Sequence, residues 1–377
     1  MSPAEQDKLG AARVVYIVSG APEHDRKGHP ETAARVPAIL DELKAAGVTA
    51  ERQGGKLLQL SNWRAATLKE LETVHCGKFI RSLRETIETK APTVVADFDN
   101  PDENTYVTRA SFDAALKASG AALALVDAVV EASKSSQGSS EVSRVPTGYA
   151  VARPPGHHAL HAEPMGFCLF NNVAIAARYA QQRHGLKKVM ILDFDVHHGN
   201  GTQDLFYDDP SVLMIDVHED RVWPGTGQLA ETGSGAGRGY MINVPLPVGS
   251  GDAAMKLALD QIIKPAAERF KPDMILISAG YDAHWRDPLE HQNFQSATYH
   301  HVLSGMRKLA DKLCGGRLVV LLEGGYSLQG LSEGVAESFL ALLGEKPIHP
   351  HEAGRGTEPS MEVVTDAIAE VKALHGL

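Results

Sequence analysis

The sequence predicts a single-domain α/β fold in which a mostly parallel central β-sheet carries helices on both faces. Short apolar runs alternate with longer segments of helical periodicity along most of the chain. Several runs are apolar at consecutive positions, as expected for parallel strands that are covered on both sides. No repeat of fixed period interrupts this alternation. We therefore predict one domain, although 377 residues could form two or three.

The predicted strands and helices alternate along most of the chain. The predicted strands are the apolar runs at residues 14–18, 149–152, 188–192, 212–217, 241–244, 274–278 and 318–322. The predicted helices are the segments at residues 31–46, 111–134, 173–184, 253–270, 297–313 and 331–343.

Two polar segments are predicted to be loops. Residues 133–143 are rich in Ser, and the alternation of strands and helices continues on both sides of them, so they do not mark a domain boundary. Residues 345–360 contain several Gly and Pro residues and precede a last helix. We expect one domain at residues 13–345, with a C-terminal loop and helix, residues 346–377, packed on it.

Charge and composition narrow the classes of function. The formal net charge of −10 gives the chain no electrostatic reason to bind a nucleic-acid backbone, although it could attract a cationic substrate. The three cysteines, Cys76, Cys168 and Cys314, have no CxxC spacing and indicate a reducing compartment.

The N-terminal residues lack an apolar run of the signal-peptide type, and no stretch reaches the length of a membrane span. We expect an intracellular protein that is neither secreted nor membrane-bound. The cytoplasm is the expected compartment, or the interior of a plastid or mitochondrion if a transit peptide has been removed.

Polar residues follow the predicted strands at their carboxyl ends. They lie at residues 153–158, at residues 193–198, at Asp282 and at residues 323–326. Ligands of open parallel sheets bind outside the carboxyl ends of the strands. We therefore expect these residues to share one rim and one site.

Two of these segments indicate a metal ion. Strand alternation places Asp193, Asp195 and His197 on one side of the chain, where buried charges need a partner or a metal. Their oxygen and nitrogen ligands suit zinc, iron, cobalt or manganese, and one carboxylate could instead orient a histidine. Asp282 follows another buried strand and could supply a further ligand. The alternatives are an ion-pair network at the sheet edge and, for Asp282, the cap of a turn.

The other two segments indicate acid–base and oxyanion chemistry. Two prolines and Gly156 stiffen the loop that presents His157 and His158, whose imidazoles can act as base and acid if their environments separate their pKa values. Tyr326 follows two glycines and could donate a hydrogen bond to an oxyanion. A surface histidine pair and a packing tyrosine are the alternatives. The sequence has no GxxxxGK[ST], GxSxG or HExxH motif, so a serine triad is unsupported.

Six motifs in combination resemble the histone deacetylase family, which has the arginase/deacetylase fold. They are R-P-P-G-H-H-A, G-F-C-x-F-N-N, D-x-D-V-H-H-G-N-G-T, P-G-T-G, Y-D-A-H and E-G-G-Y. The resemblance runs from about His29 to about Leu343. The asparagine of H-H-G-N-G makes this chain similar to class II members of the family, and in particular to their bacterial and plant-organelle branch.

The resemblance implies two ion sites. Asp195, His197 and Asp282 would ligate one zinc ion. A potassium ion would lie beside it, bound by Asp193 and by the backbone carbonyls of Asp195 and His197. The family usually has Ser where this chain has Asp216, which is the fourth residue expected at the monovalent-ion site.

The resemblance also implies catalytic roles. His157 would pair with Asp193 and be mainly cationic. His158 would lie near the neutral Asn200 and act as the principal base. Tyr326 would face the carbonyl of the substrate.

A narrow acyl-lysine channel follows from the same resemblance. Gly166, Phe167 and Trp223 would flank this channel, and Leu289 would line its mouth. Arg35 would lie near its inner end.

The sequence therefore predicts zinc-dependent hydrolysis of an N-acyl amide, with acetyl-lysine in proteins as the first substrate class. The first alternative is a small acetylated amine, such as a polyamine or an arylalkylamine. Leu289 does not favour a polyamine, but the adjacent Glu290 keeps that alternative open. A non-enzymatic reader of acyl-lysine and a two-metal ureohydrolase are further alternatives, and a homo-oligomeric state is left open.

Overall fold

A central parallel sheet organises the molecule, which we describe from a computed structural model at residues 8–96, 104–136 and 145–377. The eight strands have the order β2-β1-β5-β10-β9-β6-β7-β8, and every neighbouring pair is parallel. The strands are β1 (Val14–Ser19), β2 (Leu57–Gln59), β5 (Thr147–Ala152), β6 (Val189–Asp193), β7 (Val212–Glu219), β8 (Met241–Leu246), β9 (Met274–Ala279) and β10 (Leu318–Leu322).

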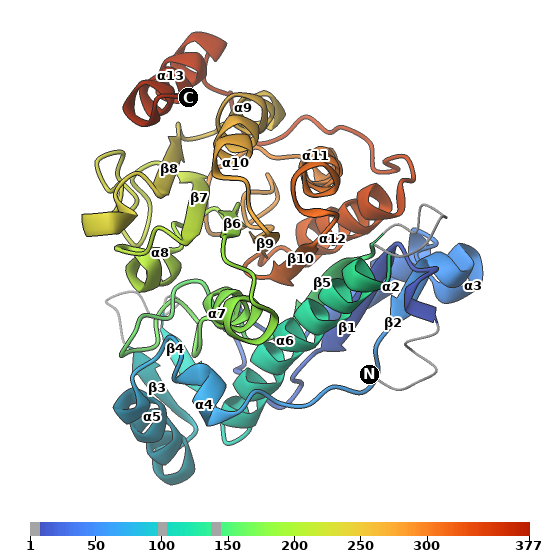
Figure 1. Cartoon of the computed structure of the whole chain (residues 1–377), viewed down its shortest axis with the longest axis vertical. Helices are drawn as coiled ribbons and strands as arrows, with labels where there is room; N and C mark the ends of the chain where they lie inside the picture. The colour runs from blue at the N-terminus through green and yellow to red at the C-terminus, as the bar shows by residue number, and fades with distance from the viewer. Residues whose placement is uncertain (1–7, 97–103, 137–144) are drawn as a thin grey trace.

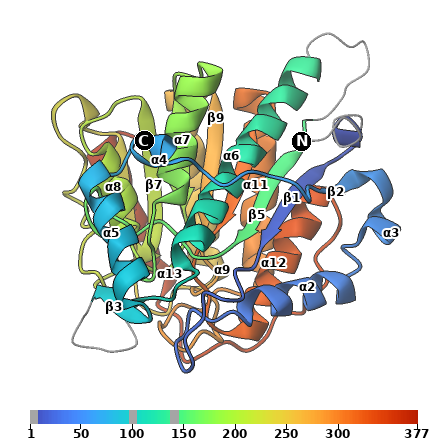
Figure 2. The same cartoon turned by 90° about the horizontal axis from the view of Figure 1, so that it is seen from below.

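Helices cover both faces of the sheet, as the sequence predicts (Figure 1). One face packs on α6 (Ser111–Ser136), α7 (Asn172–His184) and α8 (Asn200–Phe206), and α5 (Gly77–Lys90) joins the same core from beside α6. The other packs on α2 (Arg35–Ala45), α9 (Asp252–Ala258), α10 (Lys264–Phe270), α11 (Ser296–Cys314), α12 (Leu328–Leu343) and α13 (Met361–His375). Figure 2 shows α6 and α7 in front of the strands.

Strand alternation divides the buried side chains between two cores. In β10, Leu318, Val320 and Leu322 join the core of the α11 and α12 face, whereas Val319 and Leu321 join the core of the α6 and α7 face. Both sets are buried, which explains why these strands are apolar at consecutive positions.

All the predicted strands are present, and each predicted helix corresponds to helical structure. The sequence did not predict β2, the short helices α3 (Ala50–Gln53) and α4 (Leu68–Leu71), α5, α8, or the antiparallel pair β3 (Thr93–Ala96) and β4 (Thr105–Val107). The segment predicted as one helix at 253–270 contains a π-helical turn, Leu259–Ile263, between α9 and α10. Pro265 follows this turn, and because its ring nitrogen has no hydrogen to donate, a regular α-helix cannot continue through it.

The two predicted loops have different outcomes. The prediction for residues 133–143 was wrong at its start, because α6 continues to Ser136, and its remainder lies outside the described residues. Residues 345–360 form no helix or strand, and α13 follows them. Val364, Ile368 and Val371 bury one stripe of α13 in the core.

None of the helices in the described ranges combines the length and the apolar character that a membrane span requires.

Candidate metal centre and active site

Asp195, His197 and Asp282 converge at the carboxyl ends of β6 and β9. Strands β6 and β9 are neighbours in the sheet, so the segments that follow them lie side by side. His197 Nδ1 lies 3.2 Å from Asp195 Oδ1 and 3.4 Å from Asp282 Oδ2. Ligand atoms of all three residues lie within 4.8 Å of one another, and all three side chains are buried. The structure therefore brings together the predicted zinc ligands, although Asp195 and Asp282 are 87 positions apart in the sequence.

Two glycines make room for the carboxylates. A Cβ atom at Gly280 would lie 2.1 Å from Asp195 Oδ2, and a Cβ atom at Gly324 would lie 2.1 Å from Asp282 Oδ2. The backbone also orients both carboxylates. Gly324 N donates to Asp195 Oδ2 over 2.8 Å, and Val196 N donates to Asp282 Oδ1 over 2.9 Å. Only residues without a side chain fit this close to the candidate ligands.

The donor set fits a zinc ion. Asp282 Oδ2 is buried without a hydrogen-bond partner among the described residues. Burial and the charge of Asp195 raise the pKa of Asp282 to about 6, which means that the ionised form of this carboxylate is poorly stabilised. Carboxylate oxygen and imidazole nitrogen are ligands that zinc accepts, and catalytic zinc sites combine three protein ligands with one open position. A divalent cation would satisfy both the free oxygen and the charge.

His157 and His158 lie beside these residues on the loop after β5, with ring centroids 3.8 Å apart. His157 Nδ1 lies 3.0 Å from Asp193 Oδ2, and His158 Nδ1 lies 2.8 Å from Asn200 Oδ1. These are the pairs that the resemblance implies. Asn200 is in turn held by Met165, whose sulfur lies 3.2 Å from its Nδ2.

The two histidines differ in protonation. Burial disfavours the charged form of His157, but the carboxylates of Asp195 and Asp193 outweigh it and raise its pKa to about 10. Burial, followed by the charges of His157 and His197, holds the pKa of His158 well below its usual range. The arrangement thus separates a cationic imidazole from a neutral one.

Glu323 anchors the histidine loop, a role that the sequence did not predict. Its Oε2 atom accepts hydrogen bonds from Gly156 N over 2.6 Å and from His157 N over 3.1 Å. Glu323 is fully buried at the end of β10, and its partners follow β5, the neighbouring strand. The acidic first position of E-G-G-Y was the available signal.

Tyr326 is held by its backbone and its ring. Asp287 Oδ2, a second acceptor that the sequence did not predict, accepts from Tyr326 N over 2.7 Å. The Tyr326 ring packs edge-on against Phe167, with centroids 5.6 Å apart, and the Arg35 guanidinium lies 5.2 Å from its centroid. Burial raises the pKa of Tyr326 well above 10, although Arg35 opposes this shift, so the phenol is a neutral donor.

Arg35 supports the glycine turn before Tyr326. Its Nε donates to Gly325 O over 2.8 Å and its Nη2 donates to Glu323 O over 2.6 Å. Glu31 lies between Arg35 and Arg153 and pairs with both of them, and all three side chains are fully buried. The segment at residues 29–35 is therefore connected to the R-P-P-G-H-H loop through Glu31.

The predicted channel residues gather around His158. A Cβ atom at Gly166 would lie 2.3 Å from the His158 ring and 2.6 Å from Trp223. Trp223 packs edge-on against His158 at 4.6 Å and against His197 at 5.9 Å. Phe167 is buried with a φ of 66°. Gly166 and Trp223 thus lie against His158, whereas Phe167 lies against Tyr326.

Leu289 is half-buried, and its neighbour Glu290 contacts the metal cluster. Leu289 N donates to Asp287 Oδ1 over 3.1 Å. Glu290 Oε1 lies 3.2 Å from His197 Nε2, the nitrogen that faces away from Asp195 and Asp282. Glu290 can therefore fix the tautomer that leaves Nδ1 as the ligand atom.

Asp193 and Asp216 occupy paired positions on β6 and β7. Asp216 Oδ1 lies 2.6 Å from His218 Nδ1, and its Oδ2 accepts from Gly199 N over 2.9 Å. A Cβ atom at Gly199 would approach both carboxylates, at 2.6 Å from Asp193 and 3.1 Å from Asp216. Burial, opposed in part by His157, raises the pKa of Asp193 well above its usual range, and the charge of Asp216 adds to this shift.

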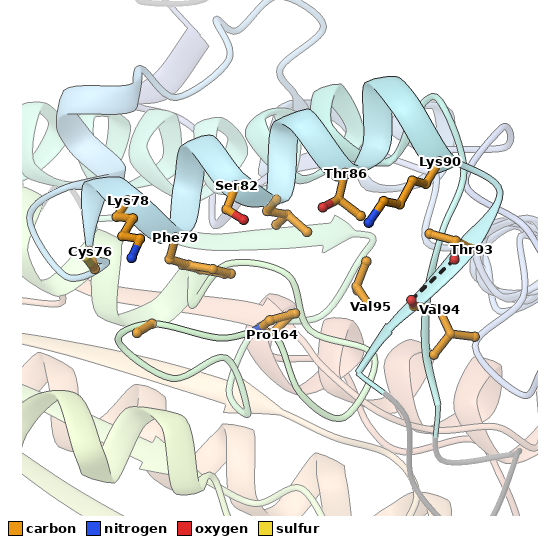
Figure 3. A pocket seen from close by; sticks show the side chains of 12 residues that line it. Cys76, Lys78, Phe79, Ser82, Thr86, Lys90, Thr93, Val94, Val95 and Pro164 are labelled. Atoms are coloured by element: carbon orange, nitrogen blue, oxygen red, sulfur yellow. Dashed lines mark hydrogen bonds between the residues drawn. The ribbon is translucent and has the colours of Figure 1, made fainter.

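A separate cavity of about 610 Å³ lies between α5, β3 and the loop at residues 162–164. Figure 3 shows Phe79, Ser82 and Thr86 on the face of α5 that borders this cavity, with Pro164 and Val95 across from them. None of the residues predicted for the active site lines it, so it is a different feature of the surface.

Comparison with known proteins gives one consistent family. The model described as "Histone deacetylase domain" matches residues 29–342. Histone deacetylase 14, chloroplastic, of Arabidopsis thaliana is 45% identical over 373 residues, which are 98% of this chain and 86% of that protein. Histone deacetylase 10, chloroplastic, of Oryza sativa subsp. japonica is 45% identical over 375 residues, which are 98% of this chain and 82% of that protein. The crystal structure of the HDA15 HD domain superimposes with a TM-score of 0.79 at 34% identity, covering 96% of this chain and 94% of that chain.

Proposed function

Because the chain belongs to the histone deacetylase family, we propose that it removes acetyl groups from lysine side chains with a zinc ion bound by Asp195, His197 and Asp282. Family membership makes the chain a deacetylase or related amidohydrolase. The observation that carries the zinc proposal is the buried Asp282 Oδ2 beside the other two ligands, which has no hydrogen-bond partner in the described part of the chain. The products are acetate and a free amine.

The bound zinc ion would act as a Lewis acid toward the amide carbonyl and would lower the pKa of a coordinated water. His158, held neutral by burial and oriented by Asn200, accepts a proton from the attacking water and then donates it to the amine nitrogen as the C–N bond breaks. His157 stays cationic beside Asp193 and stabilises negative charge in the transition state. The neutral phenol of Tyr326 donates to the oxyanion.

We further propose that Gly166, Phe167 and Trp223 form the wall of the acyl-lysine channel, with Leu289 at its mouth and Arg35 near its inner end. Their positions around His158 and Tyr326 support this assignment.

A potassium ion is proposed near Asp193, with the backbone carbonyls of Asp195 and His197. Asp216, which lies opposite Asp193, would add a carboxylate where the family usually has Ser. Two buried carboxylates at paired strand positions are stabilised by a nearby cation.

The chain resembles class II in its Asn200, and we propose that it belongs to this class. The catalytic domain would span residues 13–345, with residues 346–377 packed on it. We propose that the protein acts inside the cell, in the cytoplasm or in a plastid, since the two plant relatives are named as chloroplastic.

The second candidate function is deacetylation of a small acetylated amine. Glu290 favours it, because this carboxylate lies 3.2 Å from His197 and is 14% exposed, so that it could bind a second ammonium group of a polyamine. A substrate panel at fixed zinc separates the candidates. Acetyl-lysine peptides should give the highest kcat/KM, whereas a preference for acetylpolyamines or acetylated arylalkylamines would reverse the assignment.

The Tyr326→Phe variant is the control for this panel. It removes only the hydroxyl, so zinc content should stay unchanged while turnover falls by about 10²–10³-fold, as for the loss of one oxyanion donor. Metal analysis and kcat on the same preparation check both expectations. Unchanged turnover would contradict the oxyanion role of Tyr326.

A further inference from the structure

Glu219, Glu290 and His291 form a second group of candidate metal ligands next to the first. Glu219 is the last residue of β7, and Glu290 and His291 lie in the segment between β9 and α11. One ligand atom from each residue lies within 4.8 Å of those of the other two. The motifs that resemble the deacetylase family include none of these three residues.

The distances within this group suit a small cation. His291 Nδ1 lies 3.8 Å from Glu219 Oε1 and 3.8 Å from Glu290 Oε2. Ligand atoms about 2.1 Å from a tetrahedral ion lie about 3.4 Å from one another, so a small movement of the His291 side chain would bring the three atoms to this spacing. His291 is 64% exposed and can make that movement, and it also leaves the group open to solvent.

Glu219 provides an independent observation that points to a ligand. Its side chain is 1% exposed, and its Oε1 atom has no hydrogen-bond partner among the described residues. Its Oε2 atom accepts from His291 N over 3.1 Å, which fixes the carboxylate with Oε1 toward the His291 ring. A buried carboxylate oxygen without a partner costs free energy unless a cation or a donor reaches it.

Positive charge is scarce around these carboxylates. Within the described part of the chain, the ion pairs of Glu219 and Glu290 are made with histidines and not with Lys or Arg. Arg355 is close, but its Nη1 donates to the backbone carbonyl of Glu290 over 3.1 Å. This contact holds the segment in place without neutralising the carboxylate.

We propose that Glu219, Glu290 and His291 bind a second divalent transition-metal ion, adjacent to the proposed catalytic zinc. One imidazole and two carboxylates are a ligand set that zinc, cobalt and manganese accept. Glu290 connects the two sites, since its Oε1 atom contacts His197 while its Oε2 atom faces His291. The imidazole of His291 suits a transition-metal ion, because its ring nitrogen is a common ligand of such ions.

Titration of the metal-free chain with Zn²⁺ tests this proposal through stoichiometry. We expect about two equivalents for the natural sequence, one bound tightly and one more weakly, and about one equivalent for Glu219→Gln and for His291→Ala. Because His291 is exposed, His291→Ala should fold normally. A lost equivalent in this variant therefore cannot be attributed to the folding defect that Glu219→Gln could cause. His351→Ala, which removes another exposed histidine, should still bind two.

An Asp282→Asn variant distinguishes this proposal from the proposed function. It should lose the tight ion and keep the weak one. A single equivalent for the natural sequence, or a second equivalent that survives in His291→Ala, would overturn the second site and leave the catalytic zinc untouched. Co²⁺ absorption in the visible range repeats the count without a measurement of activity.

Discussion

At the scale of single residues, the metal centre depends on side chains that are absent as much as on those that are present. Gly324 follows β10 and approaches both candidate aspartate ligands. Its φ angle is not in the left-handed region, so alanine is compatible with the backbone there. The requirement for glycine at this position is therefore one of space.

Replacing Gly324 by Ala should weaken zinc binding. The new methyl group would lie 2.1 Å from Asp282 Oδ2 and 2.7 Å from Asp195 Oδ2, and the carboxylates would have to move. We expect a loss of at least tenfold in zinc affinity, as for the displacement of groups that orient metal ligands. Calorimetric titration with Zn²⁺ measures it. Gly10→Ala, whose Cβ would meet nothing within 4 Å, is the matched control, and equal affinity in both variants would refute the argument.

Individual residues also show what the sequence could and could not predict. Strand alternation and the position after a strand were enough to indicate Asp195, His197 and Asp282. The E-G-G-Y motif marked Glu323 as a residue of the rim, but neither its contact with the histidine loop nor the hydrogen bond from Tyr326 N to Asp287 was predicted. Those contacts depend on which strands are neighbours, and strand order is not encoded locally.

At the scale of elements, the predicted strands were the ones buried on both faces. Helix α5 was not predicted because its buried positions, Phe79, Ile80, Leu83 and Ile87, form a narrow stripe among polar residues. Their spacing of three to four residues was present in the sequence. Strand β2 has three residues and lies at the edge of the sheet, which is too short for a periodic signal.

Helix α13 attaches the C-terminal segment to the domain, and a cavity should loosen it. Ile368 is 1% exposed in the core that includes β8 and α9. Ile368→Ala should lower the free energy of unfolding by about 2–4 kcal/mol through lost burial and the cavity left behind. Urea denaturation gives the value. Val363, half exposed on the same helix, is the control, and its change to Ala should cost less than about 0.5 kcal/mol.

At the scale of the whole molecule, buried neutral histidines make stability depend on pH. Burial lowers the pKa of both His24 and His75 to about 4. His75 shows the reason, because Nδ1 bonds to Leu160 O over 2.9 Å while Nε2 accepts from Asn171 N over 2.9 Å. A proton on Nε2 would face another N–H group.

The stability that His24 and His75 contribute should therefore fall between pH 6.5 and pH 4. In this window the unfolded chain binds protons at these two residues that the folded chain does not, so their contribution to the free energy of unfolding falls as the pH falls. Each histidine contributes about 1.4 kcal/mol per pH unit, and neither contributes a slope above pH 6.5. Urea denaturation at several pH values measures the slope. His75→Gln keeps a donor and an acceptor, and a slope unchanged in this variant would contradict the assignment.

The position of β10 in the sheet also has a consequence for synthesis of the chain on the ribosome. This strand lies between β5 and β9 in the sheet, yet it is the last of the described strands along the chain. Until Leu318–Leu322 has left the ribosome, β5 and β9 each present an unpaired edge. From the emergence of β9 until the emergence of β10, the nascent protein therefore holds two separate half-sheets, and a chaperone has two open edges to protect until β10 joins them.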